Sequence, residues 1–129
     1  MYKQIRIPIR PFPAVRVNWK WWRFIPRAIE YHEKSKALRL SANMNINTIR
    51  KAMNEWSYEI IFYFAIPKTK QKMNLDQMPY DIRPDIDNLF KAFTDSIFFW
   101  KTEDDKWIWK LNATKRYGIK DEIVFCYQD

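Results

Sequence analysis

Residues 83–97 read RPDIDNLFKAFTDSI, a stretch that combines a helical apolar pattern with a stripe of charge. Because Pro84 disfavours helical geometry at the residue before it, we expect a helix that begins directly after the proline. At about 100° per residue, Asp87, Lys91 and Asp95 share an arc of roughly 80°. A second arc, of roughly 100°, is apolar and is expected to face the core; it contains Ile86, Leu89, Phe90, Phe93 and Ile97.

Two interpretations of the charged stripe are open on this pattern alone. In the first, Asp85 and Asp87 satisfy N–H groups at the helix N-terminus, and Lys91 pairs with Asp87 and Asp95, as in an ordinary surface helix. In the second, the carboxylates bind a hard divalent cation, because Mg²⁺ prefers oxygen ligands.

The sequence EDDKWIWK, residues 103–110, favours the cation. Three consecutive acids repel one another and gain little in a turn or strand unless a cation neutralises them. An alternating apolar pattern follows at once and predicts a strand, which would place Asp104 and Asp105 at its mouth. A strand packed beside the acidic helix would bring the two acid groups into one cleft.

Composition limits the class of protein. The chain has 129 residues, 47% of them hydrophobic, which predicts a single globular domain over residues 1–129. Its net charge is +8, unevenly spread: residues 1–75 hold 15 Lys and Arg against 4 Asp and Glu, a net of +11, and the rest hold 8 against 11, a net of −3. A basic half is common in nucleic-acid-binding proteins, although a solvated surface explains it equally well.

The location is expected to be cytoplasmic, without a membrane. No run of about 18 uncharged apolar residues is present, and the N-terminus is charged from Lys3 onward. Cys126 is the single cysteine and is predicted to be a packed strand residue, with no disulfide partner in the chain.

The remaining elements follow from periodicity and from the Pro and Gly positions. Residues 67–84 are polar and without periodicity, and we expect a mobile loop there. Gly118, the only glycine, is expected at a positive-φ turn position. The predicted strands are 2–9, 15–24, 58–66, 106–115 and 121–127, and the predicted further helices are 26–42 and 48–56.

The acidic region also resembles a known family. Residues 83–97 followed by WKTEDDKWI resemble the RusA family of Holliday junction resolvases, whose pattern is P-D-x-D-N-x-x-K-x-x-x-D and then D-D. The strong part covers about 25 residues, and its specificity lies in D-x-D-N-x-x-K with a downstream D-D. The chain departs from the family where Phe98, Phe99 and Trp100 replace a usual glycine. The positions in register are Pro84, Asp85, Asp87, Asn88, Lys91, Asp95, Asp104 and Asp105.

The resemblance implies a small α+β domain, with a mixed β-sheet packed against helices, that acts as a homodimer. It implies that the protein makes paired symmetric cuts in four-way DNA junctions and uses Mg²⁺, or Mn²⁺ in its place, as the metal for the reaction. By position, Asp85, Asp87 and Asp105 match the essential metal-binding acids, and Lys91 matches an active-site lysine. Asp95 and Asp104 match supporting acids.

The basic half then supplies candidates for gripping phosphates. The tryptophans at 19, 21 and 22 are open to two uses, stacking on unpaired bases or, more commonly for such residues, packing in a core or interface. The candidate DNA-binding residues are Arg6, Arg10, Arg16, Lys20, Arg23, Lys68, Lys70 and Lys72.

Two alternatives to a junction resolvase stay open from the sequence. One is a junction- or single-strand-binding protein without turnover, and the other is a metal-dependent nuclease for other branched substrates. A nuclease based on histidine, or a zinc site of Cys and His, is poorly supported because the chain holds one of each.

Overall fold

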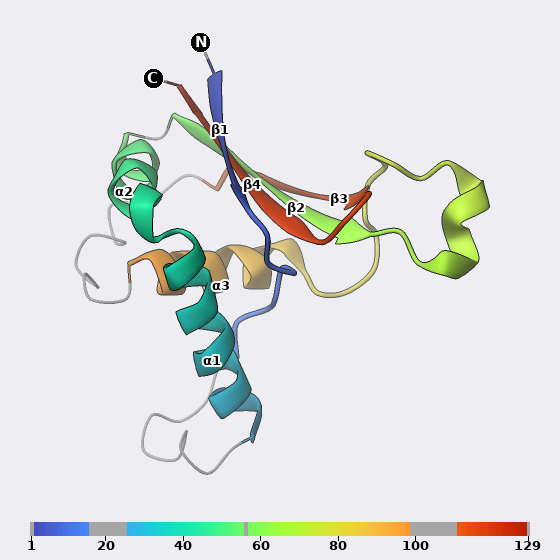
Figure 1. The fold of residues 1–129 in the computed structure, drawn as a ribbon, viewed down its shortest axis with the longest axis horizontal. Coiled ribbons are helices and arrows are strands. Elements are labelled where there is room, and N and C mark those ends of the chain that lie inside the picture. The colour runs from blue at the N-terminus through green and yellow to red at the C-terminus, as the bar shows by residue number, and fades with distance from the viewer. Residues whose placement is uncertain (1, 16–25, 56, 99–110, 129) are drawn as a thin grey trace.

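The computed structural model describes residues 2–15, 26–55, 57–98 and 111–128. Four strands and three α-helices are arranged in these ranges (Figure 1). The strands are β1 (Tyr2–Ile7), β2 (Tyr58–Ala65), β3 (Ala113–Gly118) and β4 (Glu122–Gln128); the helices are α1 (Pro26–Ser41), α2 (Ile46–Asn54) and α3 (Ile86–Ile97), with short 3₁₀ helices η2 (Asn43–Asn45) and η3 (Lys68–Met73).

The strands form one mixed sheet in the order β1-β4-β2-β3. β4 pairs antiparallel with both β1 and β2, while β2 and β3 are parallel, so the chain between them must cross over, and α3 lies in this crossover. In Figure 1 the three helices lie on one side of the sheet, and both chain ends lie together at one end of it. The expectation of a small α+β domain with a mixed sheet packed against helices is therefore confirmed.

The core lies between the sheet and α3. Alternate residues of β2, namely Ile60, Phe62 and Phe64, are almost fully buried, as a period-2 strand with one covered face requires. Phe93 of α3 meets this face edge-on at Phe62, with ring centroids 6.4 Å apart, and stacks on Phe125 of β4 at 6.1 Å. These aromatic contacts fix which side of α3 faces the sheet.

The predicted apolar arc of α3 is found in the core almost as expected. Leu89, Phe93 and Ile97 are at most 1% exposed and Phe90 is buried, while Ile86 at the helix start is only half-buried. The helix begins after Pro84, as predicted, and the peptide bond between Arg83 and Pro84 is cis.

Most predicted elements are present, with shifted ends. Helices 26–42 and 48–56 correspond to α1 and α2, and strand 58–66 is the interior strand β2. The strand predicted at 106–115 differs: in the described part it begins at Ala113 and extends to Gly118. Residues 16–25, which hold most of the strand predicted at 15–24, lie outside the described residues.

The role predicted for Gly118 is wrong. Its φ is not positive, and it is the last residue of β3 and not a turn residue. A Cβ at this position would lie 2.8 Å from Cδ1 and 3.2 Å from Cβ of Tyr63. Gly118 pairs with Ala65 of β2, and Tyr63 lies two residues before Ala65 on the same strand. Glycine is required here by the close approach of a side chain, a constraint that the sequence alone does not reveal.

Residues 67–84, expected to be a loop, contain η3 and a docked segment. Pro79 forms a β-bridge with Arg116, and the amides of Gln77 and Tyr80 donate to the carbonyls of Tyr117 and Lys115 at 2.9 and 3.0 Å. This segment covers the outer edge of β3, which would otherwise present unpaired backbone groups.

Cys126 lies on β4 and is buried, as predicted, and burial raises the pKa of its thiol. Within the described ranges, no helix has both the length and the apolar character needed to cross a bilayer.

The contact at Gly118 yields a stability prediction. Gly118→Ala is expected to lower the free energy of unfolding by about 1–3 kcal/mol, because the new methyl group overlaps the Tyr63 ring. Urea unfolding of Gly118→Ala, Tyr63→Ala and the double variant measures the coupling. The two changes should be less than additive; additive effects would show that the Tyr63 contact is not the cause.

Candidate active site

Asp85 sits at the start of α3 as its N-cap residue. Its backbone is extended (φ −67°, ψ 148°), and its carbonyl accepts a hydrogen bond from the Leu89 amide at 3.1 Å. Its side chain is exposed and, among the described residues, makes no capping hydrogen bond. A capping role, the first interpretation of this carboxylate, is therefore not what the geometry shows, and its oxygens are available to a ligand.

Asp87 lies in the first turn of α3 and is also exposed. Its Oδ1 accepts a hydrogen bond from the Asn88 amide at 2.9 Å. The carbonyl of Asn88 in turn accepts from the Ala14 amide at 3.0 Å, which docks the chain after β1 against the start of the helix. The first turn thus presents two exposed carboxylates, of which Asp87 accepts from a helix N–H group, as the first interpretation expects for it.

Lys91 and Asp95 follow on the same side of α3. Lys91 Nζ lies 3.3 Å from both carboxylate oxygens of Asp95, and none of its ion pairs in the described part of the chain is to Asp87. The Tyr31 hydroxyl of α1 donates to Asp95 Oδ2 at 3.1 Å. Lys91 is therefore oriented by a chain of two polar contacts that begins on a different helix.

Tyr31 is fixed by its own packing. Its ring meets Phe12 edge-on, with centroids 5.9 Å apart. Burial and then the neighbouring Asp95 carboxylate raise the pKa of the Tyr31 hydroxyl well above its ordinary value. The hydroxyl consequently stays protonated and acts as a donor to Asp95 throughout the neutral range.

An open cleft of about 810 Å³ lies beside the first turn of α3. Asp85 and Asn88 line it on the helix side, and residues 9–14 and Phe64 line it on the sheet side. Four of its lining residues are exposed cations: Arg10, Arg27, Lys34 and Arg83. Asp85 lines this cleft and Asp87 does not, so the surface places one exposed carboxylate among four cations, an arrangement that suits a polyanion.

Arg10 is the one described member of the predicted DNA-binding set that lies in this cleft. Its guanidinium lies 3.0 and 3.1 Å from the two oxygens of Asp121 and 5.3 Å from the Phe64 ring centroid. Asp121 also accepts from the Ala65 amide at 2.8 Å. Arg10 is thus held at the cleft wall by Asp121, which is itself bonded to the end of β2.

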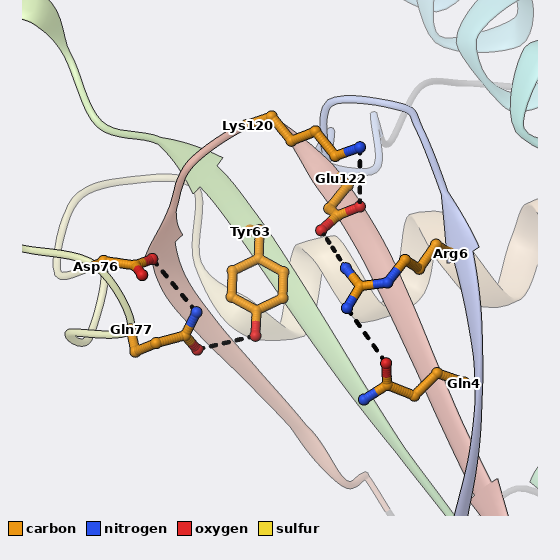
Figure 2. Close-up of polar contacts among 7 residues, drawn as sticks. All are labelled: Gln4, Arg6, Tyr63, Asp76, Gln77, Lys120 and Glu122. Atoms are coloured by element: carbon orange, nitrogen blue, oxygen red, sulfur yellow. Dashed lines mark hydrogen bonds and ion pairs between the residues drawn. The ribbon is translucent and has the colours of Figure 1, made fainter.

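Arg6 lies elsewhere, since its neighbours Ile5 and Ile7 face the core and Arg6 must face the opposite side of the sheet. Its guanidinium donates to Glu122 Oε1 at 2.7 Å and to Gln4 Oε1 at 3.3 Å. Figure 2 shows these contacts together with Lys120, which also pairs with Glu122. Three predicted DNA-binding residues belong to η3: Lys68, Lys70 and Lys72. This segment projects away from the sheet beyond the end of β2 (Figure 1) and is not part of the cleft lining.

Several predicted site residues lie outside the described residues, and the structure gives no position for them. They are Asp104, Asp105, Arg16, Lys20 and Arg23, together with the tryptophans at 19, 21 and 22. In the part of the chain that is described, no three His, Cys, Asp or Glu side chains gather at one point.

Three cleft cations were not among the sequence candidates: Arg27, Lys34 and Arg83. Arg83 immediately precedes the proline of the acidic motif, and that adjacency is a signal the sequence offered. The sequence signal for Arg27 and Lys34 is weaker. They lie seven residues apart on α1, two helical turns, and so share a side of the helix.

The first turn of α3 fits a hard divalent cation. Asp85 and Asp87 offer carboxylate oxygens, both are exposed, and Asp85 is not consumed by capping. Mg²⁺ typically takes one or two protein carboxylates and completes its shell with water and substrate phosphate. Asp85 in the basic cleft and Asp87 two residues further on would supply the protein carboxylates of such a site.

An α+β fold that presents an exposed carboxylate in a cationic cleft offers a surface suited to a phosphate polymer. The comparison with protein families specifies the class further: the family described as endodeoxyribonuclease RusA matches residues 8–124. Because this match covers most of the 129 residues, the chain belongs to the RusA endodeoxyribonuclease family, which acts on four-way junction DNA. No curated protein matches the chain.

The Tyr31–Asp95 contact yields a prediction about alkaline pH. A group whose pKa is raised by folding stabilises the protein fully below its unfolded pKa, about 10 for tyrosine, and loses that contribution as pH rises towards the folded value. The free energy of unfolding should therefore fall above about pH 10, by roughly 1 kcal/mol or less per pH unit, a figure reduced for solvent screening of a part-buried ring.

Urea unfolding of the wild type, Tyr31→Phe and Asp95→Asn at several pH values measures this slope. Tyr31→Phe should flatten it and Asp95→Asn should flatten it in part, because burial of the ring remains. Equal slopes for all three proteins would contradict the contact.

Proposed function

We propose that this endodeoxyribonuclease is a metal-dependent Holliday junction resolvase that makes paired symmetric nicks as a homodimer. The observation on which this proposal mainly rests is the start of α3, where Asp85 lines a cleft with four cations and Asp87 is exposed two residues further on. Family membership supports the reaction class and the junction substrate.

Asp85 and Asp87 would hold Mg²⁺, or Mn²⁺ in its place, and Asp105 would complete the set with Asp104 in support. When bound, such a cation lowers the pKa of water and neutralises charge on the scissile phosphate. The other roles in the reaction are assigned to side chains of the protein itself.

Lys91 would stabilise negative charge that develops on the phosphate or on the leaving oxygen. Its side chain is 44% exposed and its ammonium is paired with Asp95, so the group can meet a substrate while keeping its direction. Asp95 and Tyr31 act through Lys91 and are best described as positioning residues.

The cleft would bind the DNA backbone. Four cleft cations indicate a path for the DNA phosphates that leads to Asp85; they are Arg10, Arg27, Lys34 and Arg83. Because a four-way junction is two-fold symmetric, a C2 dimer would present two such sites to it. A nuclease of this kind works where the DNA is, which favours an intracellular location.

The test of this function is cleavage of a synthetic four-way junction in Mg²⁺. Asp87→Asn should lower the nicking rate by at least about 100-fold, because it removes the charge of a carboxylate that would hold the metal at the reacting phosphate, while junction binding survives. Asp76→Asn is the matched control, since Asp76 is an exposed acid that lies outside α3, in the segment after η3.

Each other outcome has a clear meaning. Paired nicks at wild-type rate from Asp87→Asn would exclude the α3 site. Binding by both proteins without cutting, in Mn²⁺ as well, would favour a junction-binding protein. Cutting of flaps or other branched DNA in preference to the four-way junction would favour a different nuclease specificity.

The phosphate path makes a separate prediction about salt. Each phosphate contact contributes about 0.9 to the slope of log affinity against log salt, so the double variant Arg27→Gln and Lys34→Gln should reduce the slope by about 1 to 2. Fluorescence anisotropy with a labelled junction, without divalent metal, measures it.

The control is Lys36→Gln, which removes the same charge from an exposed position on α1 outside the cleft lining. It should change the slope less than either Arg27→Gln or Lys34→Gln. Equal effects at all three positions would contradict a defined path and indicate a diffuse positive field.

A further inference from the structure

We propose that Lys115 of β3 is a positioning residue for the acidic site, setting the backbone that presents Asp85. This inference rests on the proposed metal-dependent function. Lys115 Nζ donates to the Ile82 carbonyl at 2.8 Å and to the Pro84 carbonyl at 2.9 Å. No pattern in the sequence connects this lysine with the acidic motif, which lies about 30 residues earlier.

The second of these bonds acts directly on Asp85. A peptide unit is planar, and the unit that contains the Pro84 carbonyl also contains the Asp85 nitrogen. Fixing this carbonyl therefore fixes the peptide plane from which Asp85 extends. The bond to Ile82 fixes the chain two residues earlier, so the lysine holds the backbone on both sides of Arg83.

The sheet determines where Lys115 points. It pairs with Phe62 in the parallel β2–β3 register, and paired residues project from the same face. Phe62 is buried against α3, so Lys115 also projects on the helix side, towards the beginning of α3. Its ammonium lies 5.7 Å from the ring centroid of Tyr80, which stacks on Phe64 at 4.2 Å.

The chain before Asp85 is attached to the same strand at several points. Tyr80 donates its amide to the Lys115 carbonyl at 3.0 Å, and the Tyr117 amide donates to the Met78 carbonyl at 2.9 Å. Residues 77–84 thus run along the free edge of β3, and Lys115 makes the last of these attachments before the acidic motif. A loop that ends in a metal ligand needs such support, because loops are otherwise mobile.

A charged amine suits this task better than a neutral side chain. An ammonium has three N–H donors, of which two are used here, and charge-assisted hydrogen bonds to carbonyls are stronger than neutral ones. An apolar replacement would leave both carbonyls without this donor and release the segment before Asp85.

The test compares Mn²⁺ affinity, measured by calorimetry, in the wild type, Lys115→Met, Lys115→Arg and Lys120→Met. Losing support of a metal ligand typically costs 10- to 100-fold in metal affinity, so Lys115→Met should raise the Mn²⁺ Kd by about 10-fold or more. Lys115→Arg keeps N–H donors and should recover most of it. Lys120→Met is the control, because Lys120 lies just after β3 and pairs with Glu122, away from Asp85.

Melting temperature and metal-free junction binding are measured on the same proteins. Weakened Mn²⁺ binding with both of these near wild type, and recovery by arginine, supports the positioning role. Unchanged Mn²⁺ affinity in Lys115→Met overturns it, and so does a loss that matches a general fall in stability. Should Lys115→Met not fold, Lys115→Gln takes its place under the same criteria.

The outcomes also separate this inference from the proposed function. A wild-type protein that binds no Mn²⁺ and cuts no junction removes the proposed function itself. A wild-type protein that binds and cuts, alongside a Lys115→Met variant that matches it, removes only the role of Lys115.

Discussion

The burial of one side of α3 against the sheet determines the rest of the molecule. Leu89, Phe93 and Ile97 occupy the core, and the stack of Phe93 on Phe125 leaves the helix a single rotation about its axis. Because helical side chains three and four residues apart share a side, this rotation also fixes Asp87, Lys91 and Asp95 on the opposite side. Core packing and the direction of the charged groups are therefore the same constraint.

The start of α3 is where the fold and the site meet. Two separate parts of the chain reach it, residues 9–14 through the Asn88 carbonyl and β3 through Lys115, while α1 contacts the far end of the helix through Tyr31 and Asp95. Each contact joins residues far apart in sequence, so the site forms only when the domain has folded. Such support from several elements is how a protein keeps functional groups in place on an otherwise exposed surface.

The sequence predicts α3 well because its signals are local. A proline, a period of 3.6 and a stripe of charge define the helix, its start and its two sides without knowledge of the fold. The same holds for β2, whose apolar run ends at a proline. The candidate site is likewise readable from the chain, because the acids of the motif lie close together in sequence.

What the sequence could not supply are contacts between distant segments. The sequence suggests a turn at Gly118, whereas the Tyr63 side chain is what requires glycine. Arg27 and Lys34 join the cleft only because α1 packs beside α3, and Lys115 reaches Pro84 only because β3 is parallel to β2. These relations depend on the tertiary arrangement and leave no periodic mark on the chain.

Paramagnetic broadening tests directly whether the first turn of α3 binds the divalent metal. Trace Mn²⁺ is added to ¹⁵N-labelled protein, and the amide signals that weaken first locate the ion. The amide signals of Asp85, Asp87 and Asn88 are expected to weaken first and to recover when excess Mg²⁺ is added. Broadening that is spread over the surface, or centred on other acids such as Asp76 and Asp81, would contradict it.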